Sequence, residues 1–133
     1  LMNPPFHDPA TQPPSPDPDR RQAHAAERGV LAHWTRTASR LLRPEGVLTV
    51  IHPADRLADI LTALDESFGA VAILPVYGKP RTAAIRLLVR AVKESRGPLT
   101  ILPPLVLNDE RGKPTADAEA VLRAGAALPL AAD

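Results

Sequence analysis

The chain has 133 residues, 44% of them hydrophobic, which is enough for one domain with a buried core but not for two. Its sixteen basic side chains are nearly balanced by fifteen acidic ones, and this net charge of +1 excludes a polybasic nucleic-acid-binding protein, although single arginines can still contact phosphate. The absence of cysteine excludes disulfides and zinc-thiolate sites, and the four histidines have no metal-ligand spacing. No apolar run is long enough to span a membrane, so we expect a cytoplasmic protein with no membrane partner.

The chain opens on the apolar pair Leu1-Met2, which predicts the last residues of a buried strand. Because ligands gather at the carboxyl ends of strands in open α/β sheets, Asn3 is expected at a ligand-binding edge. The first residue is not methionine and lies inside the expected strand. We therefore expect a truncated chain, from which the sequence before this strand is missing.

The next residues, Asn3-Pro4-Pro5-Phe6, are suited to binding a planar amino group. The side-chain oxygen of Asn3 and the backbone carbonyl of Pro4 offer two acceptors, and proline fixes the direction of the second. Two acceptors would pull the amino nitrogen toward a tetrahedral shape and stabilise the positive charge that develops as it attacks a methyl group. Phe6 would stack on the plane of the base or amide. The alternative is a proline-rich turn with an incidental asparagine.

Residues 4–20 contain seven prolines, which predict a loop without regular structure. The sequence leaves two interpretations open: a substrate-facing flap beside Asn3, or a solvated polyproline linker. Arg20-Arg21 ends this loop, either as a phosphate contact or as an exposed surface pair.

Apolar residues at spacings of three and four predict a helix over 23–43, in which Trp34 is expected to anchor the core. A continuous apolar run at 47–51 predicts a strand covered on both faces. Pro53 then opens a helix that is expected to reach about Ser67 and to be closed by Gly69.

Two strand-like runs, 70–76 and 84–92, are separated by a loop rich in turn formers and basic groups, and they predict an antiparallel pair. Short strands are expected at 99–102 and 105–107, followed by a turn over 108–114. Thr115 is expected to cap a last helix.

The Asn-Pro-Pro-Phe motif resembles the signature of S-adenosylmethionine-dependent amino methyltransferases, which act on adenine, cytosine, guanine or glutamine nitrogens. Three segments together are similar to the bacterial tRNA(valine) adenine amino-methyltransferase family over essentially the whole chain. These are Asn3-Pro4-Pro5-Phe6-His7-Asp8, Leu42-Arg43-Pro44-Glu45-Gly46-Val47-Leu48 and Pro104-Leu105-Val106-Leu107-Asn108-Asp109, the last with a helix after Thr115.

The resemblance implies an α/β fold, namely the carboxy-terminal half of a Rossmann-like methyltransferase domain, with a mixed sheet that has an antiparallel strand and with flanking helices. The whole chain would be one partial domain: the motif and proline-rich loop (1–22), a helix-strand-helix-strand-strand unit (23–94) and a carboxy-terminal extension (95–133). Asn3 and Pro4 would be catalytic, with Asn3 also near the cofactor S-adenosylmethionine. Pro5, Phe6 and His7 would bind the substrate, an RNA and most specifically a tRNA, although a lone His7 is more often simply exposed.

No general base is expected, because a methylated amino group of this kind loses its proton readily. The seven glycines include no close pair, so the glycine-rich turn and the acidic residues with which such folds hold the cofactor are missing. The isolated chain is therefore expected to be inactive. The open alternatives are a guanine-amino methyltransferase acting on rRNA, a protein-glutamine methyltransferase, and a non-enzymatic module that presents the proline-rich loop.

Overall fold

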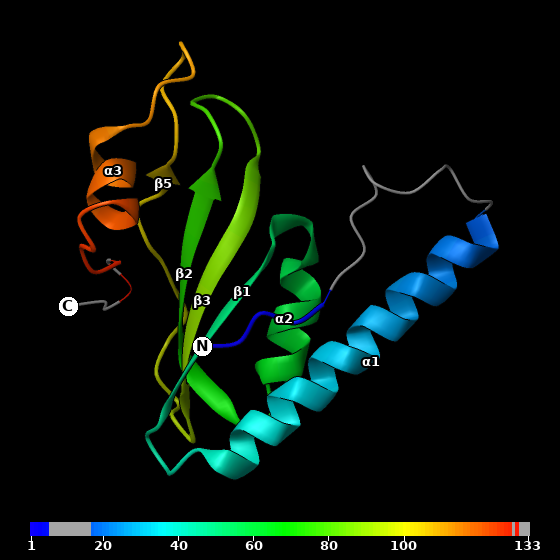
Figure 1. Cartoon of the computed structure of the whole chain (residues 1–133). Coiled ribbons are helices and arrows are strands. Elements are labelled where there is room, and N and C mark those ends of the chain that lie inside the picture. The colour runs from blue at the N-terminus through cyan, green and yellow to red at the C-terminus, as the bar shows by residue number, and fades with distance from the viewer. Residues whose placement is uncertain (6–16, 129, 131–133) are drawn as a thin grey trace.

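The computed structural model of the chain describes residues 1–5, 17–128 and 130 (Figure 1). In this described part of the chain, three helices and five strands are joined mainly by short loops. In chain order the elements are α1 (Asp17–Leu41), β1 (Val47–Pro53), the single 3-10 turn η1 (Ala54–Arg56), α2 (Leu57–Leu64), β2 (Phe68–Tyr77), β3 (Ala84–Lys93), β4 (Thr100–Ile101), β5 (Leu105–Val106) and α3 (Ala116–Leu122).

The strands form one mixed sheet in the order β1-β3-β2-β4, and β5 also pairs with β2. β3 is antiparallel to both β1 and β2, so β1 and β2 run in the same direction and their carboxyl ends share one edge of the sheet. We call this the carboxyl edge. The antiparallel β2–β3 pair and the mixed α/β sheet predicted from the sequence are confirmed.

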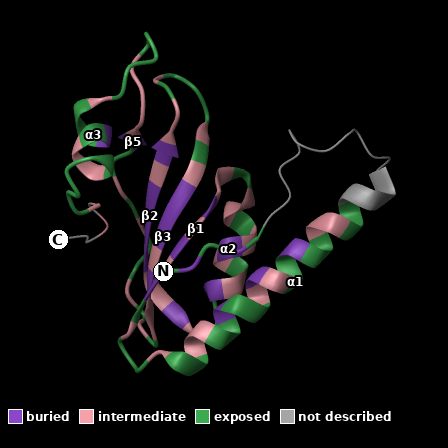
Figure 2. Ribbon diagram, viewed as in Figure 1, coloured by how far each residue is buried: buried purple, intermediate pink, exposed green. Residues whose placement is uncertain are grey.

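Alternate side chains of the strands pack on opposite faces of the sheet, as the period of two requires. One face meets α1 and α2, and its core includes Val50, Ile60, Leu64, Ile73 and Val89. The other face is covered by the chain that follows β3, and its core consists of Leu74, Val76, Leu88 and Leu105, with Leu128 and Leu130 packed against it. The central strands are therefore buried on both sides (Figure 2).

The first residues extend this sheet beyond β1. The N–H of Met2 donates to the carbonyl of Thr49 at 2.6 Å, and the N–H of Ile51 donates to the carbonyl of Met2 at 2.9 Å. Met2 is buried and forms a parallel bridge with Val50, on the side of β1 that faces away from β3. Leu1-Met2 was predicted to end a buried strand. The prediction holds for Met2, which pairs with β1, but it was wrong for Leu1, which is exposed.

Two predictions about α1 were wrong. The helix begins at Asp17 rather than near residue 23, because Pro18 lies in its first turn, where a missing N–H and a fixed φ do no harm. Trp34 is 37% exposed and is not a core anchor. The buried stripe of the helix runs through Glu27, Leu31 and Thr35, one position away from Trp34, which instead lines a surface groove of about 410 Å³ with Met2 and Val47.

Gly69 was predicted to end α2, but it lies in β2 opposite Val92. α2 stops earlier, and Asp65 is its C-cap. The reason for a glycine here is a close approach of backbone, since a Cβ on Gly69 would lie 2.0 Å from the carbonyl oxygen of Ser95. The expected cap at Thr115 is confirmed, because its hydroxyl accepts the N–H of Ala118 at 3.1 Å.

We therefore expect Gly69→Ala to destabilise the chain by about 1–3 kcal/mol, because the added methyl group must displace backbone rather than a side chain. Gly29→Ala is the matched control: no atom lies within 4 Å of its Cβ position, and it sits inside α1. Alanine there should stabilise the helix by roughly 0.5–1 kcal/mol. Urea denaturation of both variants measures the difference, and equal midpoints would contradict the close-approach argument.

Candidate functional site

The motif residues lie at the carboxyl edge, beside the end of β1. Continuing the Met2–Val50 register by two residues places Pro4 level with His52. Asn3 is exposed, Pro4 is fully buried, and Pro5 is exposed. This arrangement anchors the motif through Pro4 while Asn3 remains open to solvent, as a ligand contact requires. Phe6 and His7 lie outside the described residues, so their proposed substrate contacts stay predictions, as do the catalytic roles of Asn3 and Pro4.

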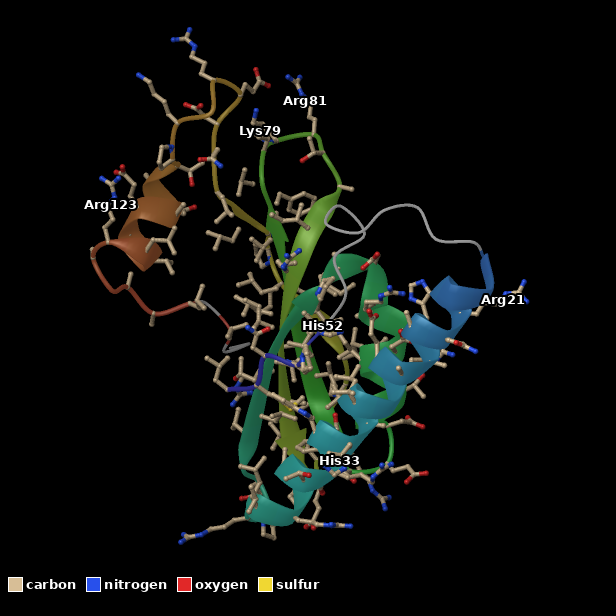
Figure 3. All side chains as sticks on the ribbon, turned by 45° about the vertical axis from the view of Figure 1, so that its right-hand side comes forward. Arg21, His33, His52, Lys79, Arg81 and Arg123 are labelled. Carbon is tan, nitrogen blue, oxygen red and sulfur yellow. The ribbon has the colours of Figure 1, made fainter. Side chains whose placement is uncertain are left out.

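His52, which sequence reasoning missed, is buried at the end of β1 between the sheet and α1 (Figure 3). Burial lowers the pKa of His52 below its ordinary value of 6.5, partly opposed by the negative charge of Glu27. The signal for this position was the alternation Leu48, Val50, His52, which continues the buried face of the strand by one more step. The lowered pKa favours a neutral imidazole, which lies at the strand position level with Pro4.

An ion pair joins α1 to the turn that follows β1. Nη2 of Arg56 lies 3.3 Å from Oε2 of Glu27, and the two side chains are only 17% and 8% exposed. Nδ1 of His24 is 4.0 Å from the same carboxylate oxygen. Because Glu27 occupies the core-facing stripe of the helix, the pair fixes how α1 sits over the carboxyl edge.

A polar groove of about 530 Å³ lies beside this ion pair, between the first half of α1 and the start of α2. Arg21 and Arg28 line it from α1, and Arg56 and Asp59 line it from the other side. Arg21 is exposed, and Arg20 lies in the first turn of the same helix. The phosphate contacts suggested for Arg20 and Arg21 stay predictions, and the groove contains acidic as well as basic groups.

Within the described residues, no glycine-rich turn of the kind that binds S-adenosylmethionine follows a strand. The cofactor needs a glycine-rich turn at a strand end, but β1 is followed by Ala54–Arg56, and β2 is followed by a single glycine, Gly78. Gly69 and Gly97 pack closely against neighbouring backbone or Ala70 and cannot serve instead. No group of His, Asp and Glu side chains in the described ranges could hold a metal ion.

Comparison with solved structures shows that this fold resembles known proteins. The chain is similar to the crystal structure of a predicted O-methyltransferase, protein Atu636 from Agrobacterium tumefaciens, with a TM-score of 0.71 and 31% sequence identity over 75% of this chain. The chain has a methyltransferase-like fold. It spans about half of that relative, 49% of its length. Searches of protein-family models and of curated proteins found no match. No helix in the described part of the chain is long and apolar enough to span a membrane.

The buried ion pair leads to a test of stability. We expect Glu27→Gln to cost about 2–4 kcal/mol, because it leaves the mostly buried Arg56 guanidinium with only the exposed carboxylate of Asp55, at 3.9 Å. The matched control is Glu119→Gln, which removes an exposed partner of Arg123 and should cost less than about 1 kcal/mol. Chemical denaturation at pH 7 measures the free energy of unfolding of both variants. Equal decreases would show that burial of the Glu27–Arg56 pair does not increase its contribution to stability.

His52 predicts a dependence of stability on pH. Its pKa is lowered in the folded chain, so the unfolded chain takes up the proton first as the pH falls. The stabilising contribution of neutral His52 is complete above pH 6.5 and is lost as the pH falls through the lowered value. His52→Asn should flatten the fall of the unfolding free energy between about pH 7 and pH 5, whereas His33→Asn, at an exposed position, should not. Identical pH profiles for both variants would contradict the assignment.

Proposed function

We propose that these residues form the acceptor-binding half of an S-adenosylmethionine-dependent methyltransferase that modifies the exocyclic amino group of adenine in RNA, with tRNA as the substrate. The observation that supports this most is the position of Asn3-Pro4 at the carboxyl edge of a methyltransferase-like sheet. The cofactor-binding half of the site would come from sequence outside these 133 residues.

The proposed reaction forms a bond from the amino nitrogen to the methyl carbon and breaks the bond between that carbon and sulfur. When bound, the cofactor supplies the electrophilic methyl group and leaves as a neutral thioether. The two N–H groups of the acceptor donate to the side-chain oxygen of Asn3 and to the carbonyl oxygen of Pro4, and this stabilises the positive charge on nitrogen. The nitrogen then loses one proton to water, which requires no general base.

The side-chain chemistry favours an amino acceptor over a hydroxyl acceptor. A planar NH2 group presents two hydrogens and matches two fixed acceptors, whereas a hydroxyl presents one. The relative from Agrobacterium tumefaciens is named as a predicted O-methyltransferase. Methylation of an oxygen is therefore the competing result that the experiment must distinguish from methylation of an amino group. Burial of Pro4 supports the proposal, since a buried proline holds its carbonyl in one direction.

The decisive variant is Asn3→Ala in the natural gene product that contains these residues. Because Asn3 is exposed, the fold should survive, while methyl transfer should fall by about two to three orders of magnitude, as when one preorganised hydrogen-bonding group of an active site is removed. Asn3→Asp keeps an acceptor oxygen in place and should retain more activity than Asn3→Ala. Transfer of a labelled methyl group to unmodified tRNA, followed by nucleoside digestion, measures both.

The same assay separates the other acceptors. Label recovered as methylated guanosine from rRNA, as methylated glutamine in a protein, or on an oxygen would replace the adenine proposal with that chemistry. Full activity of Asn3→Ala would refute the role of the motif altogether. Turnover by the 133 residues alone would refute the view that the cofactor site is incomplete.

A further inference from the structure

Two loops at the carboxyl edge lie side by side and hold each other in place. They are the β2–β3 loop, 78–83, and the turn that follows β5, 108–114. The backbone N–H of Asn108 donates to the carbonyl of Gly78 at 3.0 Å, and its side-chain amide donates to the same oxygen at 3.2 Å. The Arg81 guanidinium also pairs with the Glu110 carboxylate. We call this pair of loops the two-loop platform.

The turn is rigid within itself as well. One carboxylate oxygen of Asp109 accepts the backbone N–H groups of Arg111 and Lys113, both at 2.9 Å. Gly112 closes the turn with a φ of 82°, a conformation that favours glycine. The platform therefore presents its side chains from a backbone that does not have to be ordered on binding.

The exposed ends of this platform are basic. Lys79, Arg111 and Lys113 are exposed, and no carboxylate among the described residues lies within ion-pair distance of them. Figure 3 shows Lys79 and Arg81 projecting outward from the tip of the β2–β3 loop. Of the two acids in the platform, Glu110 is paired with Arg81 and Asp109 is bonded to backbone. Three cations thus remain available to an external anion.

Charge is distributed unevenly between the two ends of the sheet. The platform carries four basic and two acidic side chains. The three loops at the opposite edge, 42–46, 65–67 and 94–99, carry two basic and four acidic ones. The chain as a whole is nearly neutral. The platform end of the sheet is therefore more positive than the opposite end, and this difference does not come from a general excess of positive charge. An anionic partner is directed to the carboxyl edge.

The platform stands beyond the motif and does not overlap it. His52, which is level with Pro4, pairs with Leu87, and β3 begins three residues earlier at Ala84. At about 3.3 Å per residue, the β2–β3 loop starts about 10 Å beyond the level of Pro4. A group bound at Asn3 does not reach this far by itself, but the backbone of a polynucleotide that continues from it does.

We propose that the two-loop platform, through Lys79, Arg111 and Lys113, binds the phosphate backbone of the nucleotides that flank the methylated base. This inference rests on the proposed function, because it takes the carboxyl edge as the side from which the acceptor approaches. In this proposal the platform contributes to affinity by binding several phosphates of one chain. Single nucleotides and small-molecule acceptors do not offer such a series of phosphates.

The test is a salt titration of RNA binding by the 133-residue chain, using a fluorescent RNA hairpin with unpaired loop adenines. The triple variant Lys79→Ala/Arg111→Ala/Lys113→Ala should weaken binding about tenfold or more near 0.1 M salt. It should also reduce the slope of log affinity against log salt by about two to three units, close to one for each lost phosphate contact.

The matched control is Arg40→Ala/Arg43→Ala/Arg96→Ala, which removes three exposed charges at the opposite edge. It should leave both affinity and slope nearly unchanged. Equal losses in the two triple variants would show attraction to total charge and would overturn the proposal, as would an unchanged slope in the platform variant. Binding is measured without methyl transfer, so the two proposals can fail separately. A gene product that binds RNA through the platform but methylates nothing would refute the proposed function and leave only the phosphate-binding role of the platform.

Discussion

Strand β3 is the element on which the described structure depends, because it is hydrogen-bonded along its length to β1 on one side and β2 on the other. Val89, at its centre, is fully buried. The antiparallel direction of β3 lets β1 and β2 point the same way while only a short loop joins β2 to β3. The common carboxyl edge, the position of Asn3 and the two-loop platform all follow from this arrangement.

The pairing of Met2 with β1 positions the candidate site on this sheet. Two backbone hydrogen bonds set Asn3 and Pro4 beside the end of β1, and the ion pair between Glu27 and Arg56 holds α1 over the same edge. In the function proposed above, Asn3 and Pro4 would bind the acceptor.

Much of the fold could be predicted from the sequence because period-two and helical patterns report directly on burial. The β2–β3 pair, the short strands and the cap at Thr115 came from such local signals. The start of α1 was misassigned because Pro18 lies in its first turn, and two further positions were misassigned for other reasons. Gly69 looked like a helix terminator but is required by the backbone at Ser95, and Trp34 lay one position off the buried stripe.

The part of the candidate site that is a contiguous sequence motif could be picked out from the sequence. The part that is formed by residues far apart in the sequence could not. Asn3-Pro4 could be recognised from four adjacent residues. His52, Glu27 and Arg56 come from a strand, a helix and a turn, and their polar character gave no sign that they are buried together. The platform was likewise invisible, since its charges belong to two loops that only the sheet brings into contact.

The hairpin formed by β2 and β3 has a consequence for how such proteins diversify. Parallel strands need a helical crossover, so changing their length disturbs the layer that packs on them. A hairpin can gain or lose a pair of residues at its tip while the helices and the core keep their places. The distance between the β2–β3 loop and the motif can therefore change, in evolution or by design, without rebuilding the domain. In the function proposed above, that distance would determine which acceptors bind.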